Sequence, residues 1–200
     1  METSDCTMLT KDEKKYLTQV TEHWFDHLKP EDWFAQSDQI DQGIIDAFSH
    51  IYDHFKSKNL IELDLSGDEI LAAIILFDQM PRNIFRGHAK AYETDALALS
   101  LCFMALANKY DLDMTDIQKS FVYMPLEHSE DMNDQELSVS LFKQRTKLDD
   151  QIDYAVRHLT IISKFGRFPH RNKALGRVST AQEEEFLASG GDNFGTKEGT

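Results

Sequence analysis

The 200-residue chain is poor in the residues that interrupt helices. It has four prolines and nine glycines, and four of those glycines lie among the last eleven residues. Proline and glycine are the strongest breakers of regular secondary structure. No segment shows the alternation of apolar and polar residues that is typical of a strand. We therefore predict an all-α fold.

The chain also lacks any apolar run near the roughly 20 residues that cross a bilayer. Its first residues, METSDCTMLTKDEKK, do not have the basic-then-apolar order of a secretory signal. Only two cysteines occur, Cys6 in a polar stretch and Cys102 in an apolar one, so a structural disulfide is not expected. These features predict a cytoplasmic protein without membrane association.

Sequence motifs for several kinds of chemistry are missing as well. There is no HExxH or EF-hand spacing, no Walker or GxGxxG loop and no GxSxG elbow. We therefore predict neither a metal nor another cofactor. Basic residues are few, 21 against 35 acidic ones, which gives a net charge of -14. This excess of negative charge disfavours nonspecific binding to nucleic acid.

Helical spacing and capping residues predict a single domain over residues 10–188, between a disordered tail at 1–9 and a flexible tail at 189–200. Its hydrophobic content of 41% is that of a globular protein. We expect a compact bundle of about seven or eight helices. The first four predicted helices run from after Thr10 to near Pro30, from after Ser37 or Asp38 to near residue 56, from after Ser66 to before Pro81, and from after His88 to Asn108. The next four run from after Thr115 to before Pro125, from after Asp131 to residue 148, from residue 150 to residue 165, and from after Thr180 to residue 188.

Residues 165–177, FGRFPHRNKALGR, form a basic loop in an otherwise acidic chain. They contain three arginines, one lysine and one histidine, and no acidic residue occurs from Tyr154 to Gln182. Arginine forks and loop amides can bind a phosphate or a carboxylate. Phe165 and Phe168 could instead stack on single-stranded RNA, but the acidic chain makes a small anion the better partner. A structural alternative is that these arginines neutralise carboxylates of neighbouring loops.

Two further polar segments are expected to lie against the basic loop. The first is FDQMPRNIFRG at residues 77–87, where Asp78 follows Ile74 by four residues and so faces the core. The second is YMPLEHSED at residues 123–131, which supplies carboxylates and a histidine. His158 lies on the inward stripe of its helix, close to the basic loop. A carboxylate beside a histidine can orient a general base, although an inward histidine is more often structural.

These segments define the candidate site. We predict acid–base roles for five residues: His128, His158, His170, Asp78 and Glu127. We predict ligand-binding roles for seven more: Arg82, Asn83, Arg86, Arg167, Arg171, Asn172 and Arg177.

The same segments carry a resemblance to a known family. LAAIILFDQMPRNIFRG, FVYMPLEHSED and RHLTIISKFGRFPHRNKALGRVSTAQEEEFL resemble the signature blocks of the bacterial family called domain of unknown function number 924, over about residues 20–188. This resemblance implies a fold like that of the tetratricopeptide superfamily, but it implies no catalytic residue. The chain shows no 34-residue repeat, which disfavours a peptide-binding superhelix.

Two functions remain open from the sequence. In the first, the loops form a pocket for a small anionic ligand, with or without acid–base catalysis. In the second, the polar loops are structural, and the protein is a non-catalytic interaction module whose helix faces bind a partner protein. The sequence is compatible with an enzyme and with a binding protein.

Overall fold

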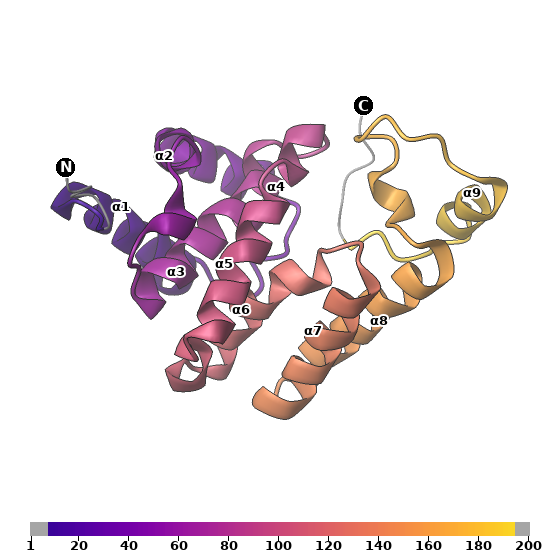
Figure 1. The fold of residues 1–200 in the computed structure, drawn as a ribbon. Helices are drawn as coiled ribbons and strands as arrows, with labels where there is room; N and C mark the ends of the chain where they lie inside the picture. Colours follow the sequence, from indigo (N-terminus) through magenta and orange to yellow (C-terminus); the bar gives the residue numbers. More distant parts are fainter. Residues whose placement is uncertain (1–7, 195–200) are drawn as a thin grey trace, which may run out of the picture.

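The regular secondary structure is entirely helical in the computed structural model, which describes residues 8–194 (Figure 1). The predicted all-α class is therefore confirmed. The α-helices are α1 (Lys11–Glu22), α2 (Asp38–Lys56), α3 (Gly67–Ile74), α4 (Met80–Ile84), α5 (Asp95–Ala107), α6 (Asp116–Glu127), α7 (Met132–Arg145), α8 (Asp149–Phe165) and α9 (Ala181–Ala188).

The helix starts follow the predicted capping residues. Thr10, Ser66 and Thr180 each close a capping box with a glutamate three residues later. In each box the hydroxyl accepts a backbone N–H of the first turn, and the glutamate accepts the N–H of the cap, so two donors without helical partners are satisfied. Thr115 closes a fourth box with Gln118.

Two predicted helix ends are wrong, and both involve proline. Pro81 lies in the first turn of α4, where a missing N–H costs nothing, and the π-helical turn Ile75–Gln79 joins α3 to α4. Pro125 lies inside α6, which continues to Glu127. Pro125 is buried, so it packs in the interior although proline has no N–H for a helical hydrogen bond. The site therefore stands on two helical segments, residues 67–84 and 116–127, rather than on loops that follow helices.

Other predicted bounds shift less. The expected helix at 89–108 is divided into a 3-10 turn, Ala89–Tyr92, and α5. The predicted tail at 1–9 includes Leu9, whose side chain packs in the main core, while residues 1–7 lie outside the described part. No helix in the described residues is both long enough and apolar enough to cross a membrane.

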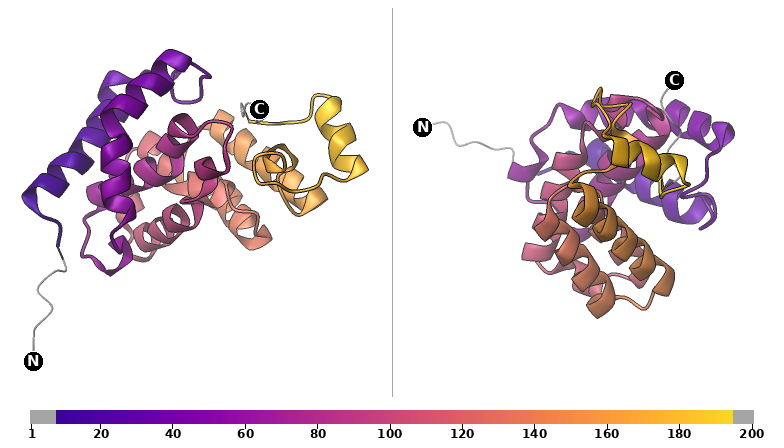
Figure 2. Two further views of the ribbon diagram at one scale, coloured as in Figure 1. Left: turned by 90° about the horizontal axis from the view of Figure 1, so that it is seen from above. Right: turned by 90° about the vertical axis from the view of Figure 1, so that its right-hand side faces the viewer.

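The elements follow one another across the molecule, from α1 at one end to α9 at the other (Figures 1 and 2). The main core is built from α1 to α8, and α7 packs along both α6 and α8. A second, smaller core joins Ile161 and Ile162 of α8 to Phe168 of the basic loop, with Phe186 of α9 packed against them. The chain after α8 thus folds back and returns the basic loop toward α4 and α6.

Candidate functional site

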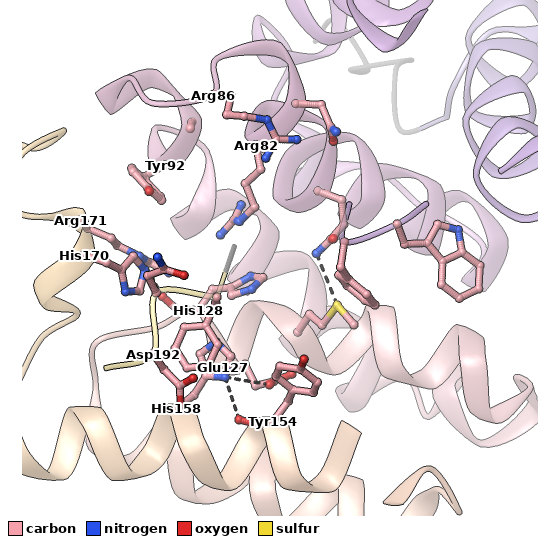
Figure 3. A pocket seen from close by; sticks show the side chains of 18 of the residues that line it. Arg82, Arg86, Tyr92, Glu127, His128, Tyr154, His158, His170, Arg171 and Asp192 are labelled. Carbon is pink, nitrogen blue, oxygen red and sulfur yellow. Dashed lines mark hydrogen bonds and ion pairs between the residues drawn. The ribbon is translucent and has the colours of Figure 1, made fainter. Parts of the chain in front are cut away.

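A cavity of about 410 Å³ lies where α4, α6, α8 and the basic loop meet (Figure 3). Its size falls within the range of small-molecule sites. In Figure 3, Arg82, His128, His158, His170 and Arg171 surround one space. The full lining comprises Trp33, Phe34, Ala35, Gln79, Arg82, Asn83, Arg86, Gly87, Ala91, Tyr92, Met124, Glu127, His128, Gln151, Tyr154, Arg157, His158, His170, Arg171, Asp192, Asn193 and Phe194.

One face of the α4 segment forms a wall of the cavity. Gln79, Arg82, Asn83 and Arg86 occupy positions i, i+3, i+4 and i+7, which share one side of a helix. Asp41 of α2 accepts hydrogen bonds from Nε and Nη2 of Arg86, at 2.5 and 2.7 Å, and one from Asn83 at 2.8 Å. Arg86 and Asn83 line the cavity, but Asp41 already occupies donors of both.

Asp78 lies behind this wall, fully buried, and holds His128. Nδ1 of His128 is 2.8 and 3.0 Å from the two carboxylate oxygens of Asp78, and Nε2 of Gln79 donates to the same carboxylate at 2.5 Å. Because the carboxylate accepts, Nδ1 carries the ring proton, and Nε2 of His128 is left with its lone pair. Both hydrogen bonds between His128 and Asp78 are made by Nδ1, and His128 is a residue of the cavity lining.

The charge states of this pair follow from burial and from Arg82. Burial would raise the pKa of Asp78, but His128, Arg82 and the two hydrogen-bond donors outweigh it and lower the pKa to about 2. Burial, followed by the charge of Arg82, lowers the pKa of His128 to about 4, against the opposing influence of Asp78. At neutral pH the pair is therefore an ionised carboxylate and a neutral imidazole.

Glu127 and His158 form a second carboxylate–histidine pair next to the first. Nδ1 of His158 donates to the Tyr154 carbonyl oxygen at 2.8 Å and lies 3.2 Å from Oε1 of Glu127 (Figure 3). The rings of His128 and His158 are 6.0 Å apart between centroids. Two histidines with ordered Nδ1 atoms therefore face one cavity, one supplied by α6 and one by α8.

Arg82 and Arg171 approach the same carboxylate, Asp95. Nη1 of Arg82 is 3.1 Å and Nη1 of Arg171 is 3.4 Å from oxygens of Asp95, and Arg82 also donates to the Asp78 carbonyl. Arg171 Nη1 donates to the His128 carbonyl at 3.0 Å. The basic loop is thereby attached to the end of α6, 43 residues earlier in the chain.

Arg171 is held rigidly, yet it is not saturated. Its guanidinium lies 4.8 Å from the ring centre of Tyr92 and 4.5 Å from that of Phe168, in the geometry of cation–π contacts. The residue is 6% exposed, and its Nε has no hydrogen-bond partner among the described residues. Burial and then the charge of Arg82 lower its pKa, although Asp95 acts in the opposite direction.

His170 also presents a donor or acceptor without a partner. Within the described part of the chain, its buried Nδ1 makes no hydrogen bond. Burial, together with the charge of Arg171, lowers its pKa to about 2, so the ring is neutral at physiological pH. An unpartnered buried nitrogen is unfavourable unless a ligand or water completes it.

Three predicted ligand-binding residues lie outside the cavity and have structural partners. Arg167 donates from Nε and Nη2 to Glu183 at 2.6 and 2.8 Å. Arg177 donates to both oxygens of Glu130 at 2.7 and 3.0 Å. Asn172 donates to Ser179 at 3.1 Å. These contacts fix the basic loop on α9 and on the turn after α6, as the structural alternative described, and we leave the three residues out of the proposed site.

The remaining predicted residues are brought together. Glu127, His128, His158, His170, Arg82, Asn83, Arg86 and Arg171 line the cavity, and Asp78 supports it from behind. Among the described residues, no group of three or more His, Cys, Asp or Glu side chains is arranged to hold a metal.

Sequence reasoning missed the aromatic and C-terminal parts of the lining. Tyr92 gave no signal, and Trp33 and Phe34 lay between the first two predicted helices, where the signal was a resemblance to the N-terminal block of the family. Residues 192–194 belong to the segment predicted as a flexible tail, of which residues 195–200 lie outside the described part. Asp192 pairs with Arg157, with Nε–Oδ2 at 2.8 Å, and the Phe194 ring stacks on His158 at 3.6 Å and 11°.

Comparison with known proteins places the chain in a family. A family model described as "Bacterial protein of unknown function (DUF924)" matches residues 20–191. A solved structure of a protein of unknown function from Agrobacterium tumefaciens is similar, with a TM-score of 0.80 and 29% identity, over 89% of this chain and 99% of that one. No curated protein matches. The resemblance found in the three polar segments is thus confirmed: the chain belongs to the bacterial family of unknown function DUF924.

Proposed function

We propose that the cavity binds a small organic anion, a carboxylate or a phosphate ester, and that His128 accepts a proton from the bound molecule or from a water beside it. The observation that carries this proposal is the Asp78–His128 pair. A buried carboxylate orients the imidazole, and the nitrogen that remains basic belongs to a cavity-lining residue.

The proton transfer follows from the geometry of this pair. His128 is neutral at pH 7, because its pKa lies near 4 in the ligand-free protein. When Nε2 takes a proton, the imidazolium forms 2.8 Å from the ionised Asp78, which stabilises it without itself being protonated. An anionic ligand adjacent to the ring raises the lowered pKa of His128 and so makes it a better base.

The anion is assigned to Arg171. Its buried guanidinium carries a lowered pKa and, among the described residues, a donor without a partner, and both are unfavourable without an opposing group. A carboxylate or phosphate oxygen supplies the missing acceptor and an opposing charge. Burial would lower the pKa of Arg82, but the charges of Asp95 and Asp78 outweigh burial and raise it. Arg82 therefore keeps its full charge beside this position.

The Glu127–His158 pair supplies a second proton-carrying group on the same cavity. The ring centre of His158 is 6.0 Å from that of His128, a separation that a small ligand can bridge. His128 therefore takes up a proton in one step, and its imidazolium returns that proton to the ligand in the next, with His158 beside it as a second hydrogen-bonding group. Neither role requires a serine or cysteine nucleophile, and Cys102 is buried in the core with a raised thiol pKa.

The first test is a binding screen. Small carboxylates and phosphate esters are tested for their effect on the melting temperature, since a ligand that binds only the folded state raises it. We expect hits with the parent protein, and we expect Arg171→Gln to lose them. Arg167→Gln is the matched control, because it removes an arginine of the same loop that lies outside the cavity.

The second test separates binding from chemistry. Asn in place of His128 keeps a donor to Asp78 but has no counterpart of the basic Nε2. We expect His128→Asn to bind the hits but no longer to convert them. Conversion of each hit is measured by mass spectrometry in isotopically labelled water. If no member of a broad panel stabilises the parent protein, the alternative of a non-catalytic interaction module is favoured instead.

A further inference from the structure

The cavity has an aromatic wall that the proton-transfer scheme does not use. Trp33 donates its Nε1–H to the Trp24 carbonyl at 2.7 Å and packs edge-on against Phe121 at 5.1 Å. Phe34 lies nearly parallel to Phe121, at 6.4 Å and 17°. Trp33 is therefore fixed in orientation by a hydrogen bond and a ring contact rather than by burial alone.

Phe34 is exposed although it is large and apolar. It leaves 54% of its surface accessible while it lines the cavity beside Trp33. Exposed apolar area costs about 25 cal/mol per Å² relative to burial. Aromatic rings stack favourably on one another, and small-molecule pockets are lined predominantly by apolar and aromatic side chains.

Helix α6 gives the direction from this wall to the charged groups. Phe121, beneath Trp33 and Phe34, is followed by Met124 on the cavity floor and then by Glu127 and His128. Seven residues of helix correspond to about 10 Å. The aromatic wall and the proton-transferring histidines thus stand at opposite ends of one helical stretch.

Helix α8 repeats this direction. It packs with α7, which packs with α6, and the successive turns of the chain make α8 run in the same sense as α6 (Figure 1). Gln151 and then Tyr154 line the cavity ahead of His158. Both helices therefore lead from neutral lining residues to a carboxylate–histidine pair, and the charges of Arg82 and Arg171 are gathered at that second end.

We propose that the ligand of this cavity is an aryl-substituted acid: a flat aromatic ring that stacks at Trp33 and Phe34, joined by a short tether to a carboxylate or phosphate bound at Arg171. This inference rests on the proposed function, because it assigns the second end of the same ligand. The helical rise from Phe121, which contacts Trp33 and Phe34, to His128, whose carbonyl contacts Arg171, is about 10 Å, a length similar to that of one ring with a two- or three-atom tether. The cavity, at about 410 Å³, accommodates such a molecule.

Three matched probes test the assignment: 3-phenylpropionate, propionate, which lacks the ring, and 3-phenylpropanol, which lacks the charge. Binding is measured by thermal shift and by tryptophan fluorescence. The chain has two tryptophans, and only Trp33 lines the cavity, whereas Trp24 is buried in the core. We expect 3-phenylpropionate to bind tightest and to change the fluorescence. Trp33→Phe removes the tryptophan at the cavity, so the fluorescence change on binding should be lost. Because phenylalanine still offers a ring to the probe, the thermal shift with 3-phenylpropionate should be retained.

Two variants assign the two ends. Phe34→Ala alters an exposed side chain and should not disturb folding. We expect it to weaken 3-phenylpropionate by about fivefold and to leave propionate unchanged, since an aromatic pair contributes roughly 1 kcal/mol. Arg171→Gln weakens both acids and leaves the alcohol unchanged. Phe103→Ala, at an exposed phenylalanine of α5 outside the cavity, is the control and should have no effect.

The outcomes distinguish the inference from the proposed function. If propionate binds as tightly as 3-phenylpropionate, or if Phe34→Ala weakens both acids equally, the aromatic subsite is wrong while anion binding stands. If 3-phenylpropanol binds as tightly as the acid and Arg171→Gln changes nothing, the anion site is wrong. If none of the three probes binds, both are overturned for this class of ligand.

Discussion

Arg167 and Arg171 belong to the same basic loop, yet their surroundings are opposite. Arg167 forms a two-pronged pair with Glu183 and donates to the Val178 carbonyl. Arg171 has one contact of 3.4 Å with Asp95, one backbone acceptor and an Nε without a partner among the described residues. The saturated arginine is the more exposed of the two, with 29% of its side chain accessible against 8%.

This difference gives the two arginines different roles: Arg167 fixes the basic loop on α9, whereas the basic loop positions Arg171 at the cavity. A bidentate pair satisfies both partners and leaves nothing for a ligand. Arg171 is buried, contacts the rings of Tyr92 and Phe168, and has an Nε without a partner among the described residues. Such an arginine is not optimised for stability. We call Arg171, Asp78 and His128 the cavity cluster. We call Arg167, Glu183 and Asn172 the pinning cluster.

The largest expected effect is in the pinning cluster. Glu183 is buried and accepts from Arg167, Asn172 and the Thr180 N–H. Glu183→Ala leaves these donors unpaired and should cost about 3 kcal/mol of unfolding free energy, measured by urea denaturation. Glu184→Ala, at the exposed neighbour on α9, is the control and should change stability by less than about 0.5 kcal/mol. Equal effects would contradict the structural role.

Acid should affect the two clusters in different pH windows. The folded-state pKa of His128 is lowered from 6.5 to about 4, so unfolding takes up a proton, and stability falls as pH decreases from 6.5 toward 4. Arg167 lowers the pKa of Glu183 from 4.5 to about 2, so its contribution is lost only below pH 4.5. Between pH 7 and 5, His128→Asn should lose about 2 kcal/mol less stability than the parent.

The control for this window is Glu183→Gln, whose stability should fall between pH 7 and 5 as steeply as that of the parent. Urea midpoints at several pH values measure both slopes. Parallel curves for His128→Asn and the parent would show that His128 is not held neutral by its surroundings.

Removal of Arg171 should cost less than removal of Glu183. Arg171→Met deletes one of two guanidinium groups near Asp95, and Arg82 remains as the partner of that carboxylate. The loss of the two Nη1 contacts, with Asp95 and with the His128 carbonyl, is offset because a buried guanidinium with an unpartnered Nε is also removed, so we expect a change below about 1 kcal/mol. A loss as large as that of Glu183→Ala would place Arg171 in the pinning cluster.

An effect on stability as small as that of Arg171→Met is expected at Phe194. Its ring covers one face of His158, and it lies near the end of the chain. Phe194→Ala should change the free energy of unfolding by less than about 1 kcal/mol. It should nevertheless speed the modification of His158 by diethyl pyrocarbonate, read by mass spectrometry, with the exposed His27 as internal reference. An unchanged rate would mean that Phe194 does not restrict access to the cavity.

The sequence by itself determined the local structure and the general position of the site. Four capping boxes and the apolar stripes follow from neighbours within one or two helical turns. Asp78 was expected on the core side because it follows Ile74 by four residues, and it is fully buried. The wrong helix ends at Pro81 and Pro125 show the limit of local rules: Pro81 lies in the first turn of a new helix, and Pro125 is buried inside α6.

The tertiary structure alone decided which polar groups saturate one another and which remain available. Asp78 and His128 are 50 residues apart, Asp41 and Arg86 are 45, and Asp95 and Arg171 are 76. No periodicity in the chain encodes such pairings, because they depend on how α4, α6 and the basic loop pack. The aromatic wall of Trp33 and Phe34 and the contact of Phe194 with His158 are likewise set by packing, since Trp33, Phe34 and Phe194 lie outside the helices.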